Sequence, residues 1–182
     1  MDGDCSNIWE TTQECLSMVL THSDLYKRPQ LLWEWAKNFM CIVHQKGEKY
    51  YYEIITAIGE AHSRSILIAL STNCSQNEKW VSENLIEFLL RCSEQEGRYP
   101  IEEKRSCIPF GFWYVLQDDL GTLDKPLDNQ AKEVLKPIYI RVSLAMIKKS
   151  TLPTTSEEAG TSDEQELFRQ YRYVTKLKYF FL

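Results

Sequence analysis

Apolar residues recur along this chain with the period of an α-helix, whereas the alternation typical of strands is rare. The stripe in the middle of the chain fits the spacing i, i+4, i+7, i+8, i+11 and consists of Val81, Leu85, Phe88, Leu89 and Cys92. Ser75 and Glu78, just before it, have the spacing of a capping box, a pattern typical of helix N-termini. The sequence therefore predicts an all-α protein.

Glycine, proline and capping residues divide the chain into seven predicted helices. They span about 7–21, 29–47, 48–70, 77–92, 104–120 and 128–149, and a last helix opens with the capping box Thr161–Glu164. Gly59 suggests a bend in the third helix, and Pro137 should kink the sixth or mark its start. The polar segment 151–161 is predicted to be a mobile loop. Among the residues expected to face the interior are Cys15, Val19, Trp35, Ile42, Phe112, Trp113 and Leu116.

The connections between these helices are short, roughly 3–12 residues, which favours antiparallel helix pairs. About three and a half such pairs would stack into an α-solenoid of the HEAT or armadillo kind. The pairs are somewhat longer than the ~40–47 residues of those repeats and show no self-similarity. A plain helical bundle fits the periodicity about as well.

The charge balance bears on which partners the chain can bind. A net charge of −5 and a pI near 5.3 argue against a nucleic-acid binder, which needs a basic face to neutralise phosphates, but they permit a basic protein partner. No apolar stretch approaches the ~20 residues of a membrane span. The opening Met1–Asp4 is acidic, unlike a secretory signal.

Residues that could carry catalysis or bind a metal are scattered. The six cysteines form no CxxC pair, so we expect reduced thiols and no zinc site. His22, His44 and His62 lack a catalytic signature, and the one close pair, Cys41 with His44, has no second pair to complete four ligands. Seven glycines form no phosphate-binding loop. We therefore expect neither an enzyme nor a cofactor.

Four acidic residues are the candidates for contact with a partner. Asp118 and Asp119 end the fifth predicted helix, where carboxylates oppose the helix dipole at a cost of a few tenths to about 1 kcal/mol. A basic residue of a neighbouring helix or a basic partner would compensate. Glu102 and Glu103 precede that helix and form either a solvated turn or a surface that steers basic partners.

The aromatic residues of the same helix have two interpretations. Phe112 and Trp113 are spaced for the core. Phe110 and Tyr114 belong either to the core and its rim or to a surface that faces a partner.

Five stretches occur in the order and near the spacing of one protein family. They are Phe112–Leu120 (FWYVLQDDL), Cys92 with Gly97, Tyr99 and Pro100, Gly59–Arg64 (GEAHSR), Pro137 with Tyr139, and Ser162–Glu164 with Phe168, Tyr171 and Arg172. Together they resemble the importin-13 branch of the importin-β (karyopherin-β) superfamily, which is near transportin-3. The likeness runs from about Trp9 to Arg172 and corresponds to a middle fragment, about a fifth of a full-length receptor.

The resemblance implies HEAT repeats, each an A and a B helix, wound into a right-handed superhelix. It further implies a concave surface that takes protein cargo and Ran-GTP, and outer slots for the phenylalanine-glycine repeats of nuclear pore proteins. Such a receptor works in the nucleus and the cytoplasm. A small helical scaffold or adaptor unrelated to transport is the alternative.

The chain departs from the family pattern at both ends. It starts in mid-family sequence, so we expect the N-terminal repeats that grip Ran-GTP to be absent, and residues 173–182 look divergent from residues 1–172. A truncated product or partial gene model is one interpretation, and a short family member with a divergent last helix is the other. Because solenoid ends need polar caps, bare ends are expected to cause self-association.

Overall fold

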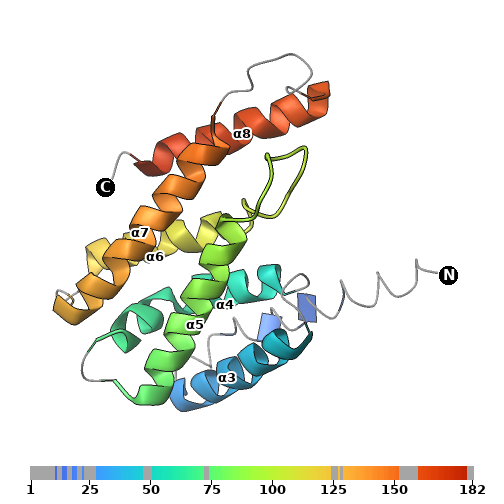
Figure 1. Ribbon diagram of the computed structural model, residues 1–182. Coiled ribbons are helices and arrows are strands. Elements are labelled where there is room, and N and C mark those ends of the chain that lie inside the picture. Colours follow the sequence, from blue (N-terminus) through green and yellow to red (C-terminus); the bar gives the residue numbers. More distant parts are fainter. Residues whose placement is uncertain are drawn as a thin grey trace.

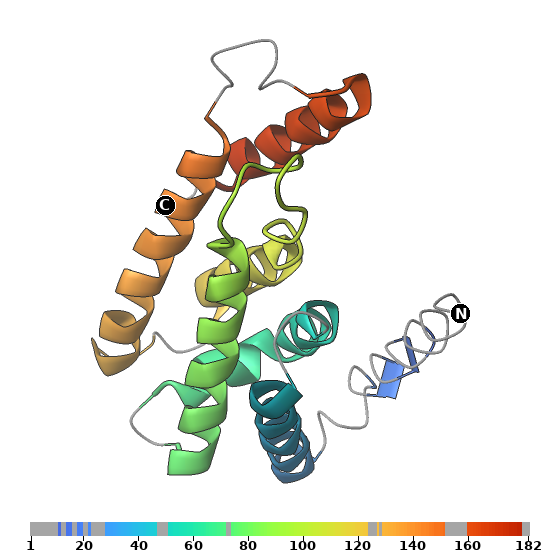
Figure 2. The same ribbon diagram turned by 45° about the vertical axis from the view of Figure 1, so that its right-hand side comes forward.

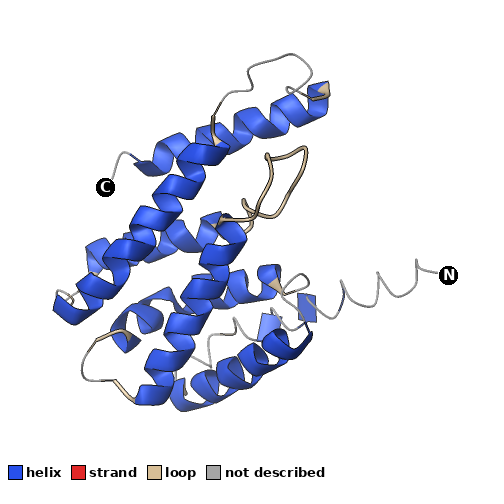
Figure 3. Cartoon of the chain, in the orientation of Figure 1, coloured by secondary structure: helices blue, strands red, loops and turns tan. Residues whose placement is uncertain are grey.

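The computed structural model describes residues 28–46, 51–71, 74–123, 127, 129–151 and 160–179, together with Thr11, Glu14, Cys15, Met18, Val19 and His22. Within this part of the chain every regular element is a helix, as Figure 3 shows. The prediction of an all-α fold is confirmed. The predicted loop 151–161 lies largely outside the described residues, and so does most of the first predicted helix.

Six helices are labelled in Figure 1. They are α3 (Pro29–Lys46), α4 (Tyr52–Ala69), α5 (Gln76–Ser93), α6 (Phe110–Thr122), α7 (Asn129–Lys149) and α8 (Ser162–Tyr179). The capping box predicted for α5 is present: Ser75 Oγ accepts from the backbone N–H of Glu78, and the Glu78 carboxylate accepts from the backbone N–H of Ser75. Thr161 and Glu164 make the same reciprocal bonds at the start of α8.

The helices stack in two layers. In the first layer α3 packs on α5 and α5 on α7, while α4 in the second layer packs on α5 and α6 (Figures 1 and 2). The aromatic ring of Tyr171 joins α8 to the second layer, because its centroid lies 4.9 Å from that of Phe110 and 4.5 Å from that of Tyr99. Each helix thus contacts its neighbours in the stack, which is the solenoid arrangement and not that of a closed bundle.

The core lies where α4, α5 and α6 meet. Phe88 and Phe112 have no exposed surface, and Trp113 is 3% exposed, so the predicted inward face of α6 is confirmed. The Trp113 indole Nε1 donates a 2.9 Å hydrogen bond to Ser93 Oγ, and this hydroxyl donates to the backbone carbonyl of Leu89 at 3.1 Å. The polar atom of the buried ring is therefore satisfied.

The predicted inward face of α3 is wrong at two positions. Trp35 and Ile42 are 41% and 47% exposed. The buried stripe consists of the two expected residues Ala36 and Val43 together with Trp33 and Met40. Apolar residues occur on more than one side of this helix, so their spacing alone did not identify the side that packs. Cys15 and Val19, expected to face inward on the first helix, are also exposed.

The predicted start of α6 was about six residues too early. The helix begins at Phe110, after Pro109 in the N-cap position, and the segment before it is a series of turns. Glu103 holds one of these turns, since its Oε2 accepts from the backbone N–H groups of Arg105 and Ser106 at 2.8 and 2.9 Å. A side chain thus replaces the helical partners of these donors.

The predicted bend in α4 is displaced, and of the two alternatives for Pro137, a kink or a helix start, the structure contradicts the helix start. The bend in α4 lies at His62, with φ −122° and ψ 19°, and not at Gly59. Pro137 neither begins nor ends α7, which continues from Asn129 to Lys149 through it. Pro137 is exposed, so its missing N–H leaves the packed side of the helix intact.

Candidate functional site

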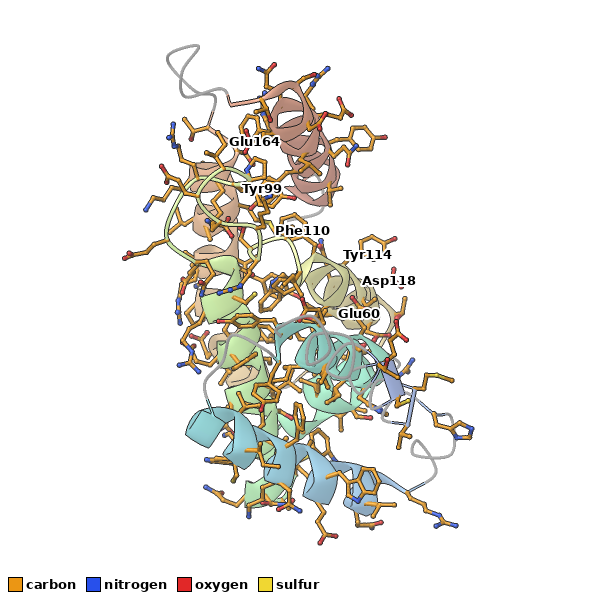
Figure 4. All side chains as sticks on the ribbon, turned by 90° about the vertical axis from the view of Figure 1, so that its right-hand side faces the viewer. Glu60, Tyr99, Phe110, Tyr114, Asp118 and Glu164 are labelled. Atoms are coloured by element: carbon orange, nitrogen blue, oxygen red, sulfur yellow. The ribbon has the colours of Figure 1, made fainter. Side chains whose placement is uncertain are left out.

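The exposed face of α6 carries an aromatic and an acidic side chain one turn apart. Tyr114 is 58% exposed, and Asp118, four residues later, is also exposed. Residues at this spacing share one face of a helix. Figure 4 shows both on the same side of the molecule as Glu60 of α4. Phe110, whose placement the sequence left open, is 7% exposed and belongs to the core.

Two glycines allow α4 and α6 to cross closely at this place. A Cβ added at Gly59 would lie 2.6 Å from Phe112 Cδ2, closer than carbon atoms approach in proteins. A Cβ added at Gly111 would overlap the carboxylate of Glu60. Glu60 therefore lies directly over the α6 backbone, between Tyr114 and the core side of the helix.

Asp119 is held within the structure and Asp118 is not. The Asp119 carboxylate accepts a hydrogen bond from Ser63 Oγ on α4. The compensation expected at the end of this helix thus comes from a hydroxyl and not from an Arg or Lys. Thr122 adds a second contribution, because its Oγ1 donates to the backbone carbonyls of Asp118 and Asp119 at 3.1 and 3.3 Å.

Glu102 lies on the exposed loop between α5 and α6. Its Oε2 accepts from the backbone N–H of Arg98 at 2.9 Å, and its Oε1 accepts from the Arg98 guanidinium at 3.1 Å. These hydrogen bonds, first from the backbone and then from the side chain, lower the pKa of Glu102. Glu102 is therefore an exposed carboxylate whose charge is partly offset by its neighbour.

Glu103 is turned into the protein, and its side chain is 8% exposed. Oε1 accepts from Lys149 Nζ at 2.8 Å and from Ser106 Oγ at 2.6 Å. Burial raises the pKa of Glu103, but the hydrogen bonds from Lys149 and Ser106 outweigh it, and the pKa is lowered overall. This carboxylate joins the loop to the end of α7, where Lys149 also donates to the Gly97 carbonyl at 3.0 Å.

The four acidic candidates do not form one patch. Asp118 and Asp119 lie in the second half of α6, and Glu102 and Glu103 lie in the loop before its first residue. The structure brings Asp119 together with Ser63 of α4 and places Glu60 of α4 over Gly111, and sequence reasoning selected neither Ser63 nor Glu60 as a site residue. The sequence feature that could have pointed to Glu60 is its position directly after Gly59, beside the packed face of the helix.

The described part of the chain has neither a metal-binding cluster nor a membrane-spanning helix. Its His, Cys, Asp and Glu side chains include no group of three placed to hold a metal ion. Among these residues, no helix is both long and apolar enough to cross a membrane. The candidate site is the exposed face of α6, which we call the α6 surface. It consists of Tyr114, Asp118 and Asp119 of α6 and Glu60 of α4.

Importin-13 is among the matches in both sequence and structure. No family model matches the chain. Importin-13 from Gallus gallus and from Homo sapiens are each 34% identical to the chain over 122 residues, which cover 65% of the chain and 12% of the relative. A solved structure of importin-13 in its cytosolic state superposes with a TM-score of 0.73 and 22% identity, over 92% of this chain and 21% of that one.

The likeness is present in both sequence and fold. The chain spans about one eighth of the length of the curated relatives that it matches. The superposition extends over more of the chain than the sequence alignment does, as expected if α-helical stacking is retained where sequence has diverged. The chain is similar in sequence to a segment of importin-13, and its helices stack as those of the solved importin-13 structure do.

Proposed function

We propose that this chain is a protein-binding segment of a nuclear transport receptor, acting in Ran-dependent transport of protein cargo between nucleus and cytoplasm. Its homology to importin-13 supports the proposal. Ran-GTP and the phenylalanine-glycine repeats of nuclear pore proteins are the further partners proposed for the receptor of which such a segment is a part.

The α6 surface is the proposed contact for a basic stretch of cargo. An exposed Tyr ring beside carboxylates suits a Lys or Arg side chain, because the ring face attracts the cation and a carboxylate accepts its N–H groups. The exposed pair Tyr114 and Asp118 is the single observation that carries this assignment. Glu102, in the loop before α6, lies outside the α6 surface and would add negative charge only at longer range, whereas the buried Glu103 is left out of the proposed contact.

The experiment is a binding titration of a fluorescent peptide rich in Lys and Arg, followed by anisotropy. Asp118→Lys is expected to weaken binding about tenfold, which corresponds to about 1.4 kcal/mol. Tyr114→Ala should weaken it through loss of the ring. Since the contact is exposed, the affinity should also fall as salt shortens the Debye length below about 8 Å.

Glu83→Lys provides the matched control, because it makes the same charge change at an exposed position of α5, in the other layer. We expect it to leave the affinity within about twofold of the parent chain. Equal weakening by Glu83→Lys and Asp118→Lys would show a general effect of net charge and contradict the assignment. Capture of Ran-GTP in preference to Ran-GDP is expected of a version extended N-terminally into the receptor, and not of an unrelated helical scaffold.

A further inference from the structure

The α6 surface takes one of its carboxylates from another helix. Residue 111 of α6 is a glycine and has no side chain of its own. A Cβ added at this position would overlap Glu60 Oε1 and lie 2.8 Å from Glu60 Cδ. The carboxylate of Glu60, which belongs to α4, therefore occupies the space that a side chain of residue 111 would fill.

Two carboxylates thus lie two helical turns apart along α6. Glu60 stands in the place of residue 111, and Asp118 follows that position by seven residues. At 1.5 Å per residue this separation is about 10 Å along the helix axis, and the two positions differ by only about 20° around it. Both carboxylates therefore lie on one face of α6, where Glu60 is half-buried and Asp118 is exposed.

The ring of Tyr114 lies between these two carboxylates along the helix. Tyr114 is 58% exposed, comes three residues after position 111 and precedes Asp118 by four. Figure 4 shows Glu60, Tyr114 and Asp118 on the same side of the molecule. Asp119 is not part of this arrangement, since its carboxylate accepts from Ser63 Oγ. The face thus offers two separate anionic positions with an aromatic ring between them.

The separation of the two carboxylates selects among the conformations that a bound segment could have. In a polyproline II segment, residues i and i+3 project on the same side about 9 Å apart. In a β-strand, same-side residues are about 7 Å or about 13 Å apart. An extended backbone can also pass beside the projecting Tyr114 ring, whereas a helix about 10 Å in diameter would meet the ring first. A polyproline II segment is therefore the best match.

We propose that the α6 surface recognises two basic side chains three positions apart in an extended segment of a partner protein. One basic side chain donates to Glu60 and the other to Asp118, while the Tyr114 ring packs against their apolar stems. This inference rests on the proposed function of the α6 surface as a contact for basic cargo. It adds the spacing and the conformation that the cargo segment must have.

The test uses fluorescent peptides of equal length and charge, in which two Arg residues lie one, two, three or four positions apart in a Pro-rich background. Anisotropy is expected to show about fivefold tighter binding at the separation of three, the contribution of one exposed ion pair. Equal affinity at all separations would overturn this inference and leave the proposed function standing, whereas no binding of any peptide would overturn both. Tighter binding of a helical peptide with Arg residues seven positions apart would also overturn it.

Gly111→Ala is the sharpest variant, because it moves the Glu60 carboxylate and leaves every charge in place. The fold should be kept, since only the end of a flexible side chain has to shift, and circular dichroism checks this. The variant is expected to lose the preference for a separation of three. Gly121→Ala is the matched control, because nothing lies within 4 Å of its added Cβ, and it should keep the preference. A folded Gly111→Ala variant that keeps the preference would contradict the proposal.

Double-mutant cycles assign each Arg of the peptide to one carboxylate. Replacement of one Arg by Gln should cost no further affinity in Glu60→Gln, and replacement of the other should cost none in Asp118→Asn. If both peptide changes weaken binding equally in both variants, the surface acts only through its general charge and the two-position arrangement is wrong.

Discussion

Glu103 and Lys149 form an ion pair whose side chains are only 8% and 5% exposed, and the pair joins the loop before α6 to the last turn of α7. Its remaining hydrogen-bonding capacity is used by Ser106, by two backbone N–H groups and by the Gly97 carbonyl. A buried charge that loses its partner costs more than the pair contributes. The largest effect on stability is therefore expected when one partner is removed and the other charge stays buried without it.

Glu103→Gln is expected to lower the free energy of unfolding at pH 7 by about 3–5 kcal/mol, because Lys149 stays buried without its counter-charge. The folded-state pKa of Glu103 is lowered below its ordinary value of 4.5. The stabilising contribution is therefore complete above pH 4.5 and is lost as the pH falls through the folded-state pKa. Urea unfolding of parent and variant should converge at low pH. Glu102→Gln, next in the chain but exposed, is the control, and an equal effect of both substitutions would refute the buried-pair argument.

At the scale of elements, the crossing of α4 over α6 depends on glycine. A Cβ at Gly59 would meet the fully buried Phe112 ring at 2.6 Å and Leu89 Cδ1 at 3.3 Å, and neither neighbour has room to move. Gly121, in α6, has nothing within 4 Å of the same added atom. The two glycines thus separate the effect of close packing from that of helix propensity.

Gly59→Ala is expected to destabilise the protein. Overpacking costs about 1–3 kcal/mol, and the better helix propensity of Ala returns at most about 1 kcal/mol of it. Gly121→Ala has only the second effect and should raise stability by up to about 1 kcal/mol. Chemical denaturation of the two variants measures the difference, and a stabilised Gly59→Ala variant would show that α4 and α6 are not in close contact.

Local sequence patterns predicted the features that local interactions determine. Both capping boxes and the buried stripe of α5 follow from residues within a turn or two of one another. The packed side of α3 and the start of α6 depend on other elements, so spacing alone misplaced them. For the candidate site, Asp119 drew notice through its place at a helix end, but its partner Ser63 is 56 positions away and is reached only through the α4–α6 crossing.

For the whole molecule, stability should vary along the stack, because each helix of a solenoid contacts only its neighbours. Among the described side chains of α8, Tyr171 alone is buried, at 4% exposed, and it packs on Tyr99 and Phe110. Tyr171 belongs to the same buried cluster as Phe88 and Phe112, and its ring lies against Phe110 and Tyr99 at one edge of that cluster. Among the described side chains, the docking of α8 therefore depends chiefly on Tyr171, with a smaller contribution from the partly buried Val174.

Tyr171→Ala is expected to release α8 while α4, α5 and α6 stay folded. Hydrogen exchange measured by mass spectrometry should show faster exchange in peptides from 162–179 by at least tenfold, equivalent to about 1.4 kcal/mol of local stability. Tyr173→Ala is the control, since Tyr173 is 66% exposed on the same helix. Equal loss of protection in α4 and α8 would mean that the chain unfolds as one cooperative unit, and the one-dimensional description of its stability would then be wrong.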